Sequence, residues 1–185
     1  MKKILLLGGS EQQIIAIKTA KKMGLYTILC DFLQDNPGQL YADKFYLAST
    51  TDKEKILGIA QEENIDGILA YASDPAAPTA AYVAEKLNLP GNPYKSVDIL
   101  CNKDKFRKFL KDNGFCTPVA KGYRFIEDAL SDLNNNIFTY PVIVKPVDSS
   151  GSKGVSQINS IEDADEKIIN AFDKSRSKRI IIENF

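Results

Sequence analysis

The first half of the chain alternates short apolar runs with segments of helical periodicity, and this alternation narrows the choice of fold more than any other feature. The apolar runs are typical of strands that are buried on both faces of a sheet. Strands separated by helices of about 10–15 residues lie parallel and are joined by right-handed crossovers. The sequence therefore predicts a small open α/β sheet of Rossmann type, with strands at Lys3–Leu7, Tyr26–Cys30, Lys44–Leu47 and Gly67–Tyr71.

The pattern changes near Gly91–Ser96, where prolines and a glycine cluster. From Ser96 we expect one helix that continues to Gly114, followed by the order strand, helix, strand, loop, strand, helix, strand. That order is typical of an α+β unit rather than of a doubly wound sheet. We therefore predict a Rossmann-like domain over residues 1–93 and a second unit over 94–185, with a separate mixed sheet holding Val142–Lys145 and Ile180–Glu183.

Composition excludes several classes of function. The 185 residues include 24 basic and 24 acidic side chains and no histidine. Balanced charge gives no net attraction to nucleic acid or to an anionic membrane, and no apolar run approaches the roughly 20 residues of a membrane-spanning helix. Catalysis by a histidine base is excluded as well. The three cysteines, Cys30, Cys101 and Cys116, have no metal-binding spacing and are typical of reduced thiols in a cytoplasmic protein.

The first candidate site is the glycine-containing turn after the first strand. Gly8, Gly9 and Ser10 are small enough for backbone amides at a helix N-terminus to face an anion, and Asp31 follows at the end of the second strand. A dinucleotide fingerprint would need glycine at Ser10 and a very small residue at Gln13, so that fingerprint is broken. A tight turn that needs glycine for its geometry and a contact with a small substrate remain as the other interpretations.

The second candidate site combines a lysine with a glycine- and serine-rich loop. Lys145 stands at the end of an apolar strand, where a buried ammonium is costly without an anionic partner. The loop Asp148–Gly154 follows, and its backbone N–H groups and hydroxyls suit phosphate oxygens. A strand rather than a helix comes next, so this is not a Walker loop. The sequence predicts a hairpin that closes over a polyphosphate.

These segments resemble the ATP-grasp superfamily, which includes biotin carboxylase, carbamoyl-phosphate synthetase and purine-biosynthesis ligases. The similarity covers essentially the whole chain, and the first domain resembles the pre-ATP-grasp domain. One departure is Asn102, where aspartate is common in the family. The motifs that carry the resemblance are Val142–Pro146, Ser150–Val155, Asn102–Phe106, Lys111–Pro118 and Ile180–Phe185.

The resemblance implies a role for each matching residue. Lys103 and Lys145 would neutralise phosphate charge, and Gly154 would let the hairpin turn. Glu183 would accept a hydrogen bond from the adenine amino group, with the Asn184 backbone along the base edge. The implied ATP-binding residues are Lys103, Lys145, Ser150, Gly151, Ser152, Gly154, Glu183 and Asn184.

The resemblance also implies the reaction: an ATP-dependent ligase that joins a small-molecule carboxylate to an amine or similar nucleophile through an acyl phosphate. In the family the Mg²⁺ ligands and the catalytic groups follow the last strand seen here, so we expect a fragment without turnover of its own. The set that could line the acceptor-substrate crevice is Gly8, Gly9, Ser10, Asp31, Ser73 and Asp74. A homodimer stays open, as do a non-catalytic nucleotide-binding or regulatory module and a fragment of a Rossmann-like oxidoreductase.

Overall fold

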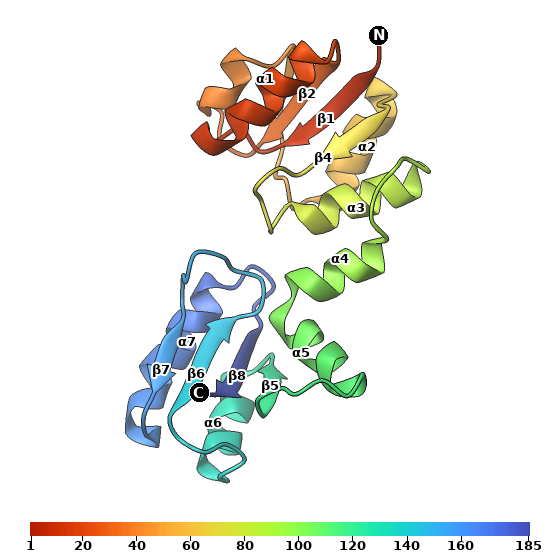
Figure 1. The fold of residues 1–185 in the computed structure, drawn as a ribbon. Helices are drawn as coiled ribbons and strands as arrows, with labels where there is room; N and C mark the ends of the chain where they lie inside the picture. Colours follow the sequence, from red (N-terminus) through yellow and green to blue (C-terminus); the bar gives the residue numbers. More distant parts are fainter. The chain divides into compact units, whose positions relative to one another are not determined.

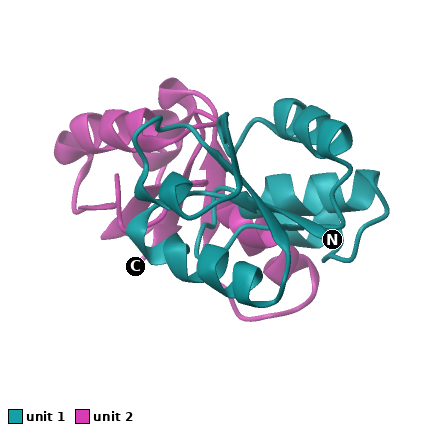
Figure 2. Ribbon diagram, turned by 90° about the horizontal axis from the view of Figure 1, so that it is seen from above, with its two compact units in different colours: residues 1–98 teal, residues 99–185 magenta.

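The computed structural model describes residues 1–185, and the chain divides into two compact units, Met1–Asp98 and Ile99–Phe185 (Figures 1 and 2). The first unit is built on a parallel four-stranded sheet in the order β3-β2-β1-β4. This confirms the predicted parallel α/β sheet. Its strands are β1 (Lys3–Leu7), β2 (Tyr26–Asp31), β3 (Lys44–Leu47) and β4 (Gly67–Leu69).

Helices cover both faces of this sheet because successive residues of its central strands point to opposite sides. Leu5 and Leu7 of β1 pack in one core with Ile56 and Val83, whereas the intervening Leu6 packs with Ile17 in another. The two cores explain why the strand is apolar at every position from Ile4 to Leu7. The helices are α1 (Ile14–Lys22), α2 (Lys53–Glu63) and α3 (Ala77–Lys86), with 3-10 turns at Glu11–Gln13 and Pro37–Leu40.

The expectation of one helix from Ser96 to Gly114 is wrong. The structure has α4 (Tyr94–Cys101) and α5 (Lys103–Asp112), and the backbone of Asn102 between them is extended, with φ −117° and ψ 111°. The Asn102 side-chain oxygen accepts a hydrogen bond from Arg179 Nη2 at 2.9 Å. A contact to a residue this distant in sequence cannot be read from local helical periodicity. The division between the two compact units falls inside α4, after Asp98.

The second unit contains a four-stranded sheet in the order β5-β8-β6-β7. Every neighbouring pair is antiparallel, so the expected mixed sheet is corrected to a fully antiparallel one. The strands joined by a helix, β5 with β6 and β7 with β8, run in the same direction, but another strand lies between the members of each pair, so no parallel strands are neighbours. The strands are β5 (Ala120–Tyr123), β6 (Val142–Pro146), β7 (Ser156–Ile158) and β8 (Ile180–Asn184).

Two helices, α6 (Ile126–Asn134) and α7 (Ala164–Lys174), cover one face of this antiparallel sheet. Val142, Val144, Ile180 and Ile182 point into the core beneath them. A capping box at Ser160 and Asp163 opens the 3-10 turn Ile161–Asp163 that leads into α7. The opposite face of the sheet therefore carries the intervening residues of β6 and β8, which are Ile143, Lys145, Ile181 and Glu183. No helix in either unit combines the length and the apolar character needed to span a bilayer.

Candidate nucleotide-binding face

The face of the second sheet that α6 and α7 leave uncovered carries Lys145 and Glu183. Lys145 of β6 is opposite Ile181 of β8, and Glu183 is opposite Ile143, so the two charged residues are diagonal neighbours across an antiparallel pair. Diagonal partners on one face lie within reach of long side chains. The strand register therefore brings together two residues that the sequence predicted as separate ATP contacts.

Glu183 is buried and paired with two cations. Lys145 Nζ is in contact with Glu183 Oε1, and Arg107 Nε of α5 donates to Glu183 Oε2 at 2.9 Å. Burial alone would raise the pKa of Glu183, but the hydrogen bonds from Arg107 and Lys145 outweigh it and lower that pKa below its ordinary value. The carboxylate is thus ionised near neutral pH with both oxygens engaged.

Lys103, the first residue of α5, contacts the beginning of the glycine- and serine-rich loop. Its backbone N–H donates to Val147 O at 3.1 Å, and its Nζ donates to Ser149 O at 2.7 Å. These contacts attach the first turn of α5 to the end of β6. The structure therefore places Lys103 beside the loop, as a role in phosphate binding requires.

The loop Asp148–Gly154 is fixed at its base and exposed at its tip. The Asp148 carboxylate accepts hydrogen bonds from Ser175 Oγ at 2.8 Å and from the backbone N–H of Ser177 at 2.7 Å. Burial would raise the pKa of Asp148, but these bonds hold it below its ordinary value. At the tip, the backbone N–H groups of Ser150, Gly151 and Ser152 have no hydrogen-bond partner. Unpaired amides in a turn with left-handed residues form an anion-binding concavity.

Gly154 closes the loop where a side chain has no room. Its φ is +72°, and a Cβ atom there would lie 2.9 Å from Pro146 Cγ and 2.9 Å from Lys174 Cβ. The sequence correctly predicts that this turn needs glycine. A larger side chain such as valine at this position would collide with Pro146 of β6 and with Lys174 of α7.

Asn184 is more constrained than the sequence indicates. Its backbone N–H donates to Val119 O at 2.9 Å, and its side-chain oxygen accepts from the Thr139 N–H at 3.3 Å. The backbone N–H is therefore used to hold the end of β8 beside the segment that leads into β5. The Asn184 N–H is therefore not available to hydrogen-bond the edge of an adenine base, and such a bond would have to come from another backbone group nearby.

In the first unit, the turn after β1 is satisfied by its own side chains. The N–H of Gly9 donates to Asp31 Oδ2 at 2.7 Å, and the N–H of Ser10 donates to Gln13 Oε1 at 2.9 Å. A Cβ atom on Gly8, whose φ is +105°, would lie 2.2 Å from Gln13 Nε2. The expectation that these amides face an anion is wrong, since Asp31 and Gln13 occupy them.

Asp31 and Gln13 are both buried, and their remaining polar atoms are also engaged. Asp31 Oδ1 accepts from the Leu33 N–H at 2.8 Å, and Gln13 Nε2 donates to the carbonyl of Tyr71 at 3.0 Å. These bonds join the ends of β1, β2 and β4 and favour the structural interpretation of the glycine turn. Of the candidate acceptor residues, only Ser73 and the exposed Asp74 have side chains without a hydrogen-bond partner, and they lie in a turn where Ser73 O accepts the Ala76 N–H.

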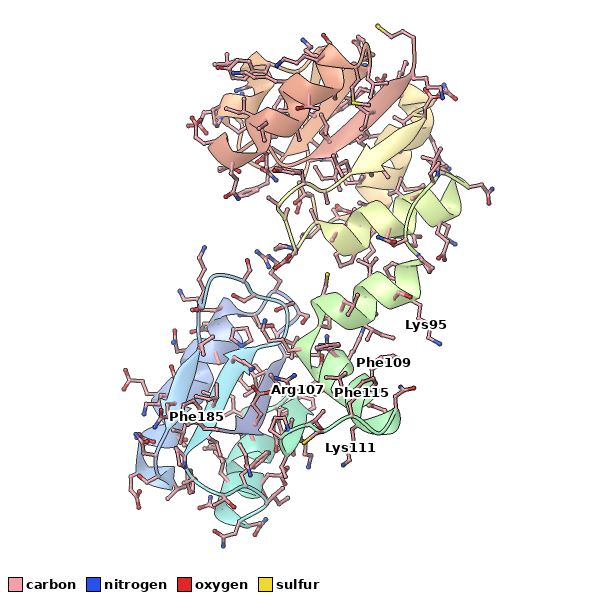
Figure 3. The ribbon with its side chains drawn as sticks, in the orientation of Figure 1. Lys95, Arg107, Phe109, Lys111, Phe115 and Phe185 are labelled. Carbon is pink, nitrogen blue, oxygen red and sulfur yellow. The ribbon has the colours of Figure 1, made fainter.

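Arg107 is the residue of this face that sequence reasoning missed. It lies four residues after Lys103, one turn along α5 (Figure 3). That spacing was the available signal, because residues i and i+4 share one face of a helix. Its partner Glu183 is 76 residues away in the sequence, and nothing local identifies it.

The chain brings no group of three or more Cys, Asp or Glu side chains together in a way that could hold a metal ion. Glu183 and Asp148 each have cations or backbone donors around their oxygens instead.

Known proteins resemble this chain in both sequence and fold. No family model matches it. It is 30% identical over 186 residues to a formate-dependent phosphoribosylglycinamide formyltransferase of Prochlorococcus marinus (strain NATL2A), an alignment covering 100% of this chain and 48% of that protein. The chain therefore spans about half the length of the curated relatives of this kind.

Two solved structures share the fold over the whole chain. An L-amino acid ligase from Bacillus licheniformis has a TM-score of 0.72 at 24% identity, with 44% of that chain covered. An N5-carboxyaminoimidazole synthetase from Staphylococcus aureus, complexed with ADP, has a TM-score of 0.70 at 21% identity, with 47% covered. At these identities the two structures establish the fold alone.

Proposed function

We propose that this chain, which matches the amino-terminal half of ATP-grasp ligases in sequence and in fold, forms one wall of an ATP site on the open face of its second sheet. The observation that carries the proposal is the convergence of Lys145, Glu183 and Lys103 at the base of a loop with unpaired backbone N–H groups. The sequence motifs predicted those residues one by one. Their proximity is an independent property of the fold.

The triphosphate is the natural partner for Lys145. In the structure its ammonium is neutralised by Glu183. A phosphate chain entering below the loop offers a stronger anionic partner, and charge-assisted bonds of this kind contribute about 1.5–3 kcal/mol each. Lys103 would contact the same triphosphate, and the amides of Ser150, Gly151 and Ser152 would close over its terminal phosphates.

Glu183 then acts as an acceptor for the base. When Lys145 moves to phosphate, Glu183 Oε1 loses its ion-pair partner, while Arg107 remains on Oε2. The retained Arg107 keeps the carboxylate ionised and fixes its direction. An ionised carboxylate can only accept hydrogen bonds, so it favours a base that presents an amino group, such as adenine.

For the protein as a whole we propose an ATP-dependent ligase that activates a small carboxylate as an acyl phosphate for attack by an amine or a related nucleophile. ATP would be used as its magnesium complex, and the metal would offset charge on the transferred phosphoryl group. The metal ligands would lie outside this chain. The acceptor crevice would lie at the carboxyl ends of the first sheet, where open α/β sheets place ligands, with contacts from Ser73 and Asp74.

Direct binding measurements test the ATP site. NMR or calorimetric titration of the 185-residue chain with Mg-ATP should give weak, saturable binding, because only one wall is present. Lys145→Ala should lower the affinity roughly ten- to more than a hundred-fold, from the loss of one charge-assisted contact. Lys22→Ala is the control, because Lys22 is an exposed lysine of α1 in the first unit and should change little.

The same samples test the absence of turnover. We expect no steady release of phosphate from ATP by the chain, with any carboxylate and amine, above the level of Lys145→Ala. Equal ATP affinity in the wild-type and Lys145→Ala proteins would contradict the proposed site, and sustained phosphate release would contradict the proposal that the catalytic groups lie outside this chain.

A further inference from the structure

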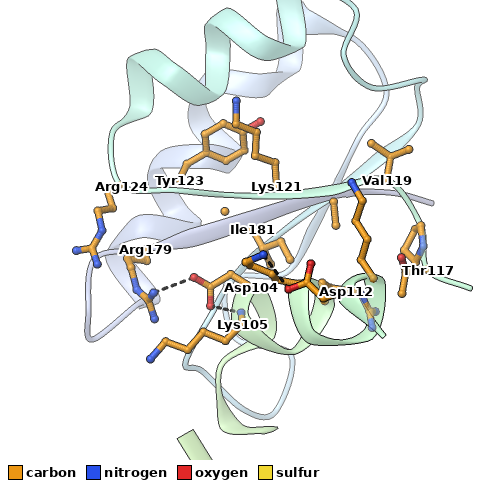
Figure 4. A pocket seen from close by; sticks show the side chains of 16 residues that line it. Asp104, Lys105, Asp112, Thr117, Val119, Lys121, Tyr123, Arg124, Arg179 and Ile181 are labelled. Atoms are coloured by element: carbon orange, nitrogen blue, oxygen red, sulfur yellow. Dashed lines mark hydrogen bonds and ion pairs between the residues drawn. The ribbon is translucent and has the colours of Figure 1, made fainter. Parts of the chain in front are cut away.

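A cavity of about 620 Å³ lies between α5 and the edge strand β5, apart from the proposed ATP contacts (Figure 4). Ile181 of β8 lines it from beneath, and Thr117 and Val119 line it from the segment that leads into β5. Neither Lys103, Lys145, Glu183 nor any residue of the glycine- and serine-rich loop borders it. The volume is within the range of about 300–1,000 Å³ typical of small-molecule sites.

Cations from three separate segments surround this cavity. Lys105, Arg107, Lys108 and Lys111 come from α5, Arg124 follows β5, and Arg179 precedes β8. Lys121 also lines the cavity, but its ammonium is paired with Asp132 of α6, so it does not add to the excess of positive charge. The chain has zero formal net charge, so this local excess is not a consequence of a basic composition.

The acidic residues of the cavity are already neutralised. Only Asp104 and Asp112 line it, and Asp104 is paired with Arg179 at 2.8 Å while Asp112 is paired with Lys108 at 2.8 Å. The charge of Arg107 is likewise paired, because its guanidinium forms an ion pair with Glu183. The side chains of Lys111, in the last turn of α5, and of Arg124, after β5, have no ion pair or hydrogen bond, and both residues line the cavity.

We infer that this cavity is a second anion site, which takes a small multivalent anion of the phosphorylated-metabolite class. Lys111 and Arg124 supply the uncompensated charge, the hydroxyl of Thr117 is available to a phosphate oxygen, and β5 is an edge strand with a row of backbone groups that the sheet does not use. Arg107 borders the cavity and also holds Glu183, so an anion there would be close to the proposed base contact. The inference stands independently of ATP binding.

The test is a titration of the 185-residue chain with inorganic pyrophosphate, in which the shifts of the backbone amides are followed by NMR at low and at higher salt. We expect saturable shifts at Lys111, Gly122 and Arg124 that weaken as salt rises, since exposed charges are screened. The double variant Lys111→Gln/Arg124→Gln should bind roughly tenfold more weakly or worse. Lys95→Gln, which removes an exposed lysine of α4 outside the cavity, should bind as the wild type does (Figure 3).

A Lys145→Ala arm separates this site from the proposed ATP site, because it should leave the pyrophosphate shifts around the cavity unchanged. The inference is overturned if the cavity amides do not shift, if Lys95→Gln weakens binding as much as the double variant, or if Lys145→Ala abolishes the shifts. Failure of Mg-ATP to bind would bear on the proposed function alone.

Discussion

Lys145 and Glu183, which are 38 positions apart in the sequence, form an ion pair on the face of the second sheet opposite α6 and α7. The antiparallel register of β6 and β8 makes them diagonal neighbours, and both side chains are largely buried. A pair of this kind satisfies a lysine and a carboxylate that would each be costly to bury alone. A phosphate bound by Lys145, as proposed, would therefore replace Glu183 as the partner of its ammonium.

The variant Arg107→Gln should reveal how strongly a cation from α5 lowers the pKa of Glu183. The variant removes one of two cations, so the pKa of Glu183 should rise toward its ordinary value, and the free energy of unfolding at neutral pH should fall by about 1–3 kcal/mol. Carboxyl ¹³C NMR titration measures the pKa directly. Lys108→Gln is the control, because Lys108 and Asp112 form an exposed pair worth little. An unchanged pKa of Glu183 in Arg107→Gln would contradict the arrangement.

The first unit should lose stability in acid through Glu63. Hydrogen bonds from Lys44 and Tyr46 lower the pKa of Glu63 to about 2, against an ordinary value of 4.5. A depressed carboxyl pKa adds stability that is fully present above the unfolded-state value and is lost as pH falls through the folded-state value. Urea unfolding should therefore show declining stability from about pH 4.5 toward pH 2.

In Lys44→Gln this acid-dependent loss should be smaller, since the folded-state pKa of Glu63 moves toward its ordinary value. Lys22→Gln, on an exposed position of α1, provides the comparison. An identical acid dependence in the wild type and Lys44→Gln would show that this ion pair does not set the pKa.

Gly154 and Gly151 offer a matched pair of substitutions in one loop. Both have positive φ, +72° and +67°, so alanine at either position should cost about 1–2 kcal/mol of backbone strain. A Cβ on Gly151 meets nothing within 4 Å, whereas one on Gly154 would collide with Pro146 and Lys174. Thermal unfolding should show Gly154→Ala as the less stable variant, by roughly a further 1–3 kcal/mol. Equal stability would mean that the loop closes differently from the structure described.

Local sequence signals predicted the strands, the hairpin and the lysine at its base, because strand periodicity and turn chemistry depend on neighbouring residues. They did not predict features that depend on distant partners. The break at Asn102 is stabilised by Arg179, and the position of Glu183 depends on Arg107. The amides of Gly9 and Ser10 looked available in the sequence only because Asp31 and Gln13 could not be placed beside them.

The most direct test of the central claim is amide hydrogen exchange of the chain with and without saturating Mg-ATP. The loop from Asp148 to Gly154 has few apolar side chains and exposed amides at its tip, so it should exchange rapidly when empty and slow down on binding. Lys145, within the sheet, should be protected in both states. The account predicts slowed exchange at Ser150, Gly151 and Ser152 with ATP and no change at Gly8 and Gly9; equal exchange of the loop in both states, with the effect appearing at Gly8 and Gly9 instead, would contradict it.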